Sequence, residues 1–395
     1  MNISKGFRYR AACFTLEGSN SFATFLYLNY LYFFMEKKFA FGDKENLAVA
    51  AWLGLIYIFT AWQAGKFAQR HGYFFALKLG FTIMAVSLAA ALMLSSVVGQ
   101  IMAASFLIFG LCFIWPTLEA LVSDGEPAAR LPHAIGIYNV VWAVTAAVAF
   151  FIGGTLIETF GYRIIFALPL AMVLLQLALT FWLQNHAAEL ARETTNPTSA
   201  APAPEPHQPA SPEARSFLRM AWLANPFAYI AINTLVAVIP GIAAKFHLSP
   251  MFAGFVCSLW CFVRLGAFLV LWHWTGWHYR FGWLATAFLG LILSFATILL
   301  ASNLALLIAA QILFGGAIGL IYYSSLFYSM DAGDTRGEHG GIHEAAIGIG
   351  NCVGPAVGAA SLQIFPEHTH NGAIAVSVLL LGGFGGLLTI WKRAN

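Results

Sequence analysis

The chain has 395 residues, of which 60% are hydrophobic and only 9% are charged, and its formal net charge is +3. A water-soluble protein carries roughly a quarter charged residues, so this composition excludes an ordinary soluble globular protein. No block of basic residues suggests nucleic acid as a partner.

Apolar runs recur from one end of the chain to the other, and each approaches the roughly 20 residues that a helix needs to cross a hydrocarbon core. The first run follows Lys5, Arg8 and Arg10, as in a signal peptide, but it holds Glu17 and Asn20 and shows no small-residue cleavage site. We therefore expect a retained first span. The runs centre near residues 22, 56, 84, 111, 145, 172, 230, 262, 290, 315, 352 and 382. The sequence predicts an all-α membrane protein with twelve transmembrane helices.

A segment rich in proline and alanine separates the sixth and seventh runs, NHAAELARETTNPTSAAPAPEPHQPASPEARS. Such a segment buries too little apolar surface to fold. We expect residues 185–216 to form a disordered cytoplasmic linker. It would join an N-terminal six-helix bundle, residues 1–184, to a C-terminal six-helix bundle, residues 217–395.

The two halves carry traces of an internal duplication. A shift of 205 residues places Asn20 on Asn225 and Gly153 on Gly358, and other matches follow in the same order. Duplicated halves in a twelve-span protein are typical of transporters whose two parts move about a central site.

The lysine and arginine residues predict the orientation. If both termini lie on one side, that side holds fourteen of these residues and the opposite side holds five. The positive-inside rule then places both termini in the cytoplasm. We expect a multi-pass integral protein of the inner or plasma membrane, acting as a monomer.

The loop after the second run reads GKFAQRHGYFF, with Gly65, Arg70 and Gly72 at the fixed positions of the pattern G-x-x-x-D-R-x-G-R-R/K and Gln69 in place of the acid. In this loop, and in its duplicated twelve-span arrangement over the whole chain, the protein resembles the major facilitator superfamily. In that family the loop latches the cytoplasmic side of the N-terminal half. The resemblance therefore implies gating roles for Gly65, Arg70 and Gly72.

A second pattern of the superfamily, G-x-x-x-G-P-x-x-G-G, is usual in the fifth span of its drug/proton antiporters. This chain has GNCVGPAVGA in the eleventh run, the duplicate of the fifth. The resemblance gives efflux a slight preference. The glycines predict a slim helix that a neighbour can approach closely, and the proline permits a bend, so we expect a gate at Gly350, Gly354, Pro355 and Gly358. The alternative is tight packing without motion.

Three charged residues lie within apolar runs. Arg264 is about halfway through the eighth run, where a charge costs roughly 2.5 to 3.5 kcal/mol on insertion scales. We expect it to face a central cavity and to bind an anionic substrate or a proton-linked acid, the alternative being a structural ion pair. Glu17 and Glu344, in the first and eleventh runs, are candidates for carrying a coupling proton or for a salt-bridge gate.

Uncharged polar residues in the runs give further candidates for the substrate site. Asn20 and Asn225 occupy matching positions, as a symmetric hydrogen-bonding pair or two helix-packing contacts would. Tyr322 and Tyr323 give the tenth run a polar, aromatic side suited to an amphipathic organic solute, although aromatic residues in membrane helices often only pack.

Glu119 lies near the predicted cytoplasmic end of the fourth run. We interpret it as one partner of a gating ion pair with Arg130 or Arg70.

His339 and His343 raise a rival hypothesis. Their spacing would let two imidazoles share a metal on a helix, as in a metal-dependent membrane enzyme or a metal carrier. Gly340 and Gly341 disfavour a helix there. We therefore expect no metal, and we keep His343 as a candidate for pH-sensitive gating.

The sequence also bears on the energy source for transport. No P-loop pattern is present, so ATP is not the evident energy source. The sequence predicts a secondary active transporter, not an enzyme, that moves a small organic solute by alternating access with proton coupling and without a cofactor. The alternatives left open are an uptake symporter for an organic anion or sugar, and a metal-dependent polytopic membrane enzyme.

Overall fold

A computed structural model describes the backbone of residues 3–123, 131–194, 211–332, 336–368 and 370–394, and the side chains of residues 7–122, 133–189, 211–329, 346–368 and 370–394. All regular structure in these residues is helical. The fourteen helices are α1 (Ile3–Phe39), α2 (Asp43–His71), α3 (Tyr73–Met93), α4 (Val97–Cys112), α5 (Trp115–Ser123), α6 (Leu131–Phe160), α7 (Ile164–Thr194), α8 (Pro212–Lys245), α9 (Pro250–Cys257), α10 (Leu259–His273), α11 (Phe281–Leu300), α12 (Leu304–Ala332), α13 (Arg336–Ile364) and α14 (Asn371–Ala394).

Two of the predicted spans are each divided into two helices. The fourth span breaks between α4 and α5 just before Pro116, which has no N–H to continue the helical hydrogen bonds. The eighth breaks between α9 and α10 at Ser258, and the side-chain amide of Gln311 on α12 donates to the Val256 carbonyl beside this break at 2.9 Å. The fourteen helices thus make twelve spans, and the predicted fold class is confirmed.

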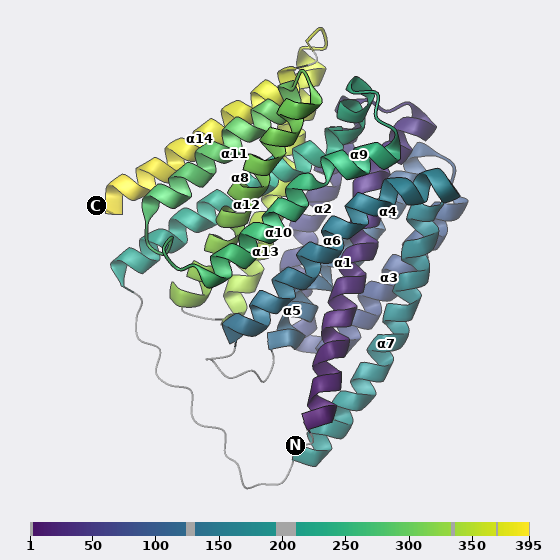
Figure 1. Cartoon of the computed structure of the whole chain (residues 1–395). Coiled ribbons are helices and arrows are strands. Elements are labelled where there is room, and N and C mark those ends of the chain that lie inside the picture. The colour runs from purple at the N-terminus through teal and green to yellow at the C-terminus, as the bar shows by residue number, and fades with distance from the viewer. Residues whose placement is uncertain (1–2, 124–130, 195–210, 333–335, 369, 395) are drawn as a thin grey trace.

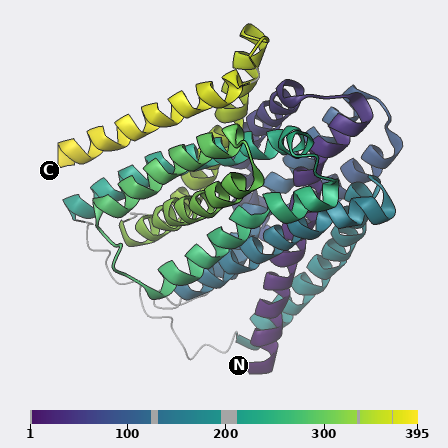
Figure 2. The same ribbon diagram turned by 45° about the horizontal axis from the view of Figure 1, so that its top comes forward.

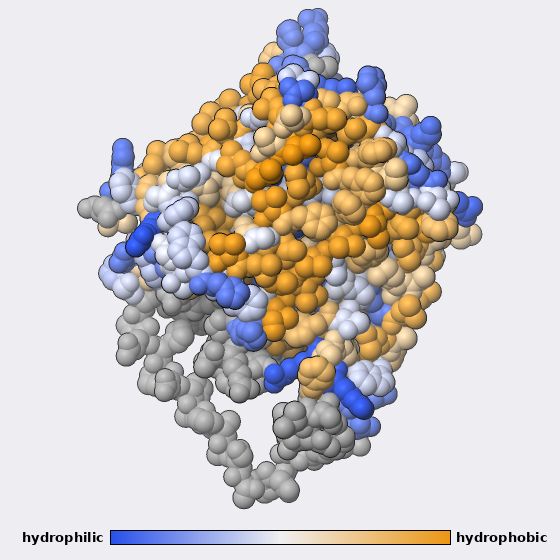
Figure 3. All heavy atoms as spheres, viewed as in Figure 1, coloured by the Kyte–Doolittle hydropathy of each residue, from blue (hydrophilic) through white to orange (hydrophobic). Residues whose placement is uncertain are grey.

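The first span differs from the others in composition. Within the described residues, eleven spans are long and apolar enough to cross a membrane, and α1 is not among them. Its polar residues Glu17, Asn20, Ser21 and Thr24 are fully buried, so they face the protein interior and not lipid. Many large hydrophobic side chains are exposed on the outside instead. Figure 3 shows hydrophobic side chains over most of the face in view, with hydrophilic ones gathered towards its edges.

The two halves repeat the same helix pairings. In the N-terminal half α1 packs against α6, and α3 against α7; in the C-terminal half α8 packs against α13, and α11 against α14. These are the same pairs of spans counted from the start of each half. Figures 1 and 2 show α1–α7 and α8–α14 as neighbouring groups of helices. The repetition agrees with the duplication read from the sequence.

The halves meet most extensively along α2 and α13, and α6 also packs against α9 and α10. Small residues allow these contacts. A Cβ atom at Gly54 would lie 2.5 Å from the Asn351 backbone, and one at Gly154 would collide with the backbone of Pro250. The chain begins, with α1, on the side of the molecule at which α2 ends. The Gly154 contact lies on the opposite side.

Two expectations about helix limits need correction. Helices extend into both ends of the range 185–216 that was expected to be a disordered linker, because α7 continues to Thr194 and α8 begins at Pro212. Ser211 caps α8 by accepting a hydrogen bond from the Ala214 N–H at 3.1 Å, and Pro212 at the first position favours a helix start. Residues 195–210 lie outside the described residues.

The second correction concerns Gly340 and Gly341, which were expected to disfavour a helix. They lie within α13, which begins at Arg336. The cost of glycine in a helix is only about 1 kcal/mol each, so the longer helical segment overrides it.

Candidate functional site

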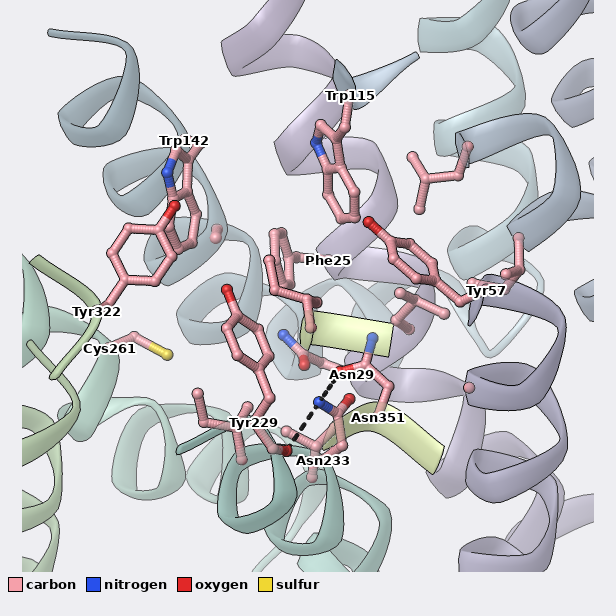
Figure 4. Close-up of a pocket in the computed structure, with 18 of the residues that line it drawn as sticks. Phe25, Asn29, Tyr57, Trp115, Trp142, Tyr229, Asn233, Cys261, Tyr322 and Asn351 are labelled. Atoms are coloured by element: carbon pink, nitrogen blue, oxygen red, sulfur yellow. Dashed lines mark hydrogen bonds between the residues drawn. The ribbon is translucent and has the colours of Figure 1, made fainter. Parts of the chain in front are cut away.

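A cavity of about 170 Å³ lies between the two halves. It is lined by residues of α1, α2, α4, α5 and α6 from the N-terminal half and of α8, α10, α12 and α13 from the C-terminal half. We call it the central cavity. Figure 4 shows that aromatic rings form much of its wall: Phe25, Tyr57, Trp115, Trp142, Tyr229 and Tyr322.

Arg264 of α10 lines the central cavity and is only 4% exposed. Its guanidinium carbon lies 4.6 Å from the Trp142 ring centre and 5.0 Å from that of Trp260, so two indole faces stabilise the charge. Within the described side chains it makes no ion pair, and its buried Nε has no hydrogen-bond partner. The structural ion pair considered from sequence is therefore not observed in the described part of the chain.

A hydrogen-bond network between the two halves positions two aromatic residues of the cavity wall. The Trp142 indole N–H donates to Asn139 Oδ1 at 2.8 Å, and the Tyr322 hydroxyl donates to the same oxygen at 3.0 Å. The Asn139 amide nitrogen donates to the Ile135 carbonyl at 2.8 Å. Asn139 thereby fixes Trp142 of α6 beside Tyr322 of α12.

Two acidic residues share the central cavity. Glu17 of α1 is fully buried and accepts a hydrogen bond from the Ser21 hydroxyl at 2.7 Å, with Tyr138 lying beside its carboxyl group. Glu119 of α5 also lines the cavity and lies close enough to Glu17 for a Coulombic interaction. Neither forms an ion pair with any described side chain.

The ion-pair partners proposed for Glu119 were Arg70 and Arg130. Arg70 is exposed at the end of α2 and makes no ion pair with Glu119. Arg130 lies outside the described residues. Glu119 is thus placed in the cavity wall, and its gating role stays a prediction.

Three further asparagines line the cavity: Asn29 on α1, Asn233 on α8 and Asn351 on α13. The Asn233 amide nitrogen donates to Asn351 Oδ1 at 2.5 Å and to the Tyr229 carbonyl at 3.1 Å (Figure 4). Sequence reasoning missed all three, and Asn139 as well. Their signal was an asparagine within an apolar run, the same signal that singled out Asn20 and Asn225.

Asn20 and Asn225 are both buried and do not line the central cavity. Their amide groups have no hydrogen-bond partner within the described part of the chain. Tyr322 lines the cavity, whereas Tyr323 packs against Phe268 and Trp277, with ring centres 6.0 Å apart in each case.

The candidates His343 and Glu344 lie outside the described side chains, as does His339. Within the described residues, no group of three or more His, Cys, Asp or Glu is placed to hold a metal.

The glycines of α13 contact α8 and α2. A Cβ at Gly350 would lie 2.5 Å from the Pro226 carbonyl oxygen, one at Gly354 would lie 2.6 Å from that of Ile230, and one at Gly358 would lie 3.1 Å from Leu47.

Pro355 lies inside α13. Gly72 joins α2 to α3 with φ of 94°, a conformation that favours glycine. At Gly65, a Cβ would meet no described atom within 4 Å other than the adjoining residues and backbone of its own helix. Gating by these residues stays a prediction.

Comparison with known proteins adds the family. Residues 13–355 match the family model described as Major Facilitator Superfamily. A search of curated proteins found no match.

Solved structures share the fold at low sequence identity. A POT family transporter in complex with 5-aminolevulinic acid is 10% identical, with a TM-score of 0.75 over 98% of this chain and 97% of that chain. A variant of the peptide transporter POT in complex with alafosfalin is 14% identical, with a TM-score of 0.72 over 98% and 94%. The human organic anion transporter MFSD10 (TETRAN) is 13% identical, with a TM-score of 0.67 over 97% and 99%.

The family match covers most of the chain, and the twelve spans in two repeated halves around a central cavity agree with it. The chain belongs to the major facilitator superfamily.

Proposed function

We propose that this protein is a secondary active transporter that carries a small organic anion, with Arg264 binding the anionic group and Glu17 carrying a coupling proton. The family and the fold support a transporter of small solutes and not an enzyme, so the metal-dependent enzyme considered from sequence is set aside.

Arg264 carries this proposal. A nearly buried guanidinium in a membrane protein costs free energy unless an anion or a polar group neutralises it. Two indole faces supply part of that stabilisation, and no described carboxylate supplies the rest. Because Arg264 lines a cavity between the halves, an anionic solute can complete its interactions there, and a guanidinium binds a carboxylate with two hydrogen bonds.

The position of Glu17 supports proton coupling. A carboxylate in the same interior needs a cation or a proton, and no described cation pairs with it. An anion entering the cavity beside Glu17 adds a like charge, which favours the protonated carboxyl group. Binding of the anion and of the proton should therefore support each other, as in a symporter.

Efflux, the direction first preferred, depends only on the pattern at Gly350 to Ala359. The shared cavity of Arg264 and Glu17 favours symport, the runner-up. We also propose that both termini lie in the cytoplasm, which the distribution of Lys and Arg supports. The monomeric state is likewise part of the proposal.

Ligand binding to the purified protein tests the role of Arg264. The probes are phenylacetate and its uncharged analogue phenylacetamide, and the readout is the thermal shift. We expect phenylacetate to stabilise the wild type more than phenylacetamide, and Arg264→Gln to remove this difference. The control is Arg280→Gln, an exposed arginine before α11 that does not line the cavity. Equal shifts with both probes, or an unchanged preference in Arg264→Gln, would contradict the proposal.

Calorimetry tests whether a proton is taken up when the anion binds. Phenylacetate is titrated near neutral pH in two buffers with different ionisation enthalpies, which reports the protons taken up on binding. We expect net proton uptake on anion binding in the wild type, at most about one proton per anion, and none in Glu17→Gln. Glu189→Gln, at an exposed position of α7, serves as control. Proton uptake that persists in Glu17→Gln would assign the proton to another group.

A further inference from the structure

Asn29, Asn233 and Asn351 have more hydrogen-bond donors and acceptors than they have partners within the described residues. The Asn233 amide nitrogen donates both to Asn351 Oδ1 and to the Tyr229 carbonyl. Within the described residues no partner is found for the Asn233 side-chain oxygen, for the Asn351 amide nitrogen, or for either polar atom of Asn29. Each amide presents both a donor and an acceptor, so the cluster offers both to the central cavity.

The central cavity gives access to these free groups. Asn29 is only 4% exposed, yet its side chain lines the cavity (Figure 4). A hydrogen bond to such a group typically contributes about 0.5 to 1.5 kcal/mol net, so a hydrogen-bonding ligand would gain free energy at this point.

Asn139, in the same cavity, provides the contrast. Its oxygen accepts from Trp142 and Tyr322, and its nitrogen donates to the Ile135 carbonyl. Both of its polar atoms therefore have partners, and its oxygen joins the two aromatic residues. The cluster of three amides therefore differs from an asparagine that serves only the structure.

We propose that Asn29, Asn233 and Asn351 form a second recognition point in the central cavity, which binds an uncharged hydroxyl or amide group of the transported anion. This inference rests on the proposed function, since Arg264 is taken to bind the anionic end. Asn29 belongs to the N-terminal half and the other two to the C-terminal half, so a solute bound here touches both moving parts.

The surroundings of the cluster describe the rest of the solute. Figure 4 shows the cluster apart from Trp142 and Tyr322, with the Tyr229 ring between them, and Phe25 and Tyr57 along the wall. Trp142 in turn contacts the Arg264 guanidinium. The matching solute has an anionic group at one end, a flat apolar body, and a neutral polar group at the other end, as in a hydroxylated or acylamino aromatic acid.

The experiment compares three probes that share the anionic end: phenylacetate, para-hydroxyphenylacetate and para-acetamidophenylacetate. Their Kd values are measured calorimetrically on the full-length protein, on Asn29→Leu and on Asn351→Leu. Leucine has the same branched shape as asparagine and removes its hydrogen bonds. Asn46→Leu is the matched control, because Asn46 is a buried asparagine of α2 that does not line the cavity.

We expect the wild type and Asn46→Leu to bind at least one of the two polar probes about three- to tenfold more tightly than phenylacetate. In Asn29→Leu and Asn351→Leu this preference should disappear while phenylacetate binding remains. Equal binding of all three probes by the wild type would overturn the proposal even if a variant failed to fold, as would a preference that survives both substitutions. Failure of the proposed function is recognised separately, by equal binding of phenylacetate and phenylacetamide, and binding of no probe would overturn both.

Discussion

The Arg264 guanidinium lies 4.6 Å from the centre of the Trp142 ring, so a nearly buried cation of the C-terminal half rests on an aromatic face of the N-terminal half. The contact does two things at once. It stabilises the guanidinium but leaves its positive charge available to an anion, because an indole face does not neutralise a guanidinium. It also links the two halves that must separate during transport, so an anion that draws Arg264 away from Trp142 would weaken that link.

A double-mutant cycle with Trp142→Leu and Arg264→Gln measures this link. We expect a coupling energy of about 1 to 2 kcal/mol in the free energy of unfolding, because the pair is shielded from water. Lys66 and Trp62 provide the matched control, since their ammonium-to-ring distance is also 4.6 Å but Trp62 is 60% exposed. That cycle should give a clearly smaller coupling, and additive effects at Trp142 and Arg264 would show that no link exists.

The contacts of α13 predict which glycines tolerate a methyl group. A Cβ at Gly350 would lie 2.5 Å from both the Pro226 carbonyl oxygen and Tyr229 Cβ, whereas one at Gly385 of α14 has no atom within 4 Å. Overpacking of this kind typically costs about 1 to 3 kcal/mol. Gly350→Ala should therefore lower the melting temperature.

Gly385→Ala should leave the melting temperature unchanged or raise it, because alanine is the better helix former. Thermal unfolding of both variants in the same detergent checks the pair. Equal tolerance at the two positions would mean that α13 does not approach α8 as closely as described.

Two buried glutamines predict opposite responses to the same substitution. Gln311 donates to the Val256 carbonyl beside the break in the eighth span, whereas both polar atoms of Gln176 are buried without a partner in the described residues. Gln311→Leu should cost about 1 kcal/mol of stability by leaving that carbonyl unpaired. Gln176→Leu should be neutral or stabilising, since it removes unpaired groups. Detergent unfolding titrations of the two variants decide this, and the reverse order would contradict it.

The spans and the charged cavity residues could be predicted from the sequence because the bilayer imposes strong constraints. A helix must be long and apolar to cross it, and a charge such as Arg264 or Glu17 is costly inside it unless it has a partner or a function. Both residues do line the central cavity. The break at Ser258 could not be predicted in this way, because the residue that contacts its backbone, Gln311, is distant in sequence.

The asparagines show the limit of the same reasoning. Asn20 and Asn29 lie on one helix within apolar sequence, and both are buried. Only Asn29 lines the central cavity. Which of two similar residues faces the cavity depends on how α1 packs against its neighbours, and a single sequence does not contain that information.

The side of the molecule opposite the termini carries a bond between the halves that predicts how the cavity opens. The Glu158 carboxylate at the end of α6 accepts a hydrogen bond from the Met251 N–H at the start of α9, at 2.8 Å. The start of a helix favours a negative charge, so this contact stabilises closure on that side. Glu158→Ala should shift the protein towards the open state there, and Glu158→Gln should have a smaller effect, because its uncharged oxygen still accepts the bond.

Cys261, whose thiol lines the central cavity, reports that opening. The other cysteines are buried except Cys352, so the measurement uses a Cys352→Ser background. In intact cells, where the proposed orientation exposes this side, a membrane-impermeant maleimide should label Cys261 about three- to tenfold faster in Glu158→Ala. Glu367→Ala, an exposed acid on the same side without a contact between the halves, should label at the background rate. If Glu158→Ala also labels at that rate, the bond does not hold this side closed, and closure there depends on the packing of Gly154 against Pro250 instead.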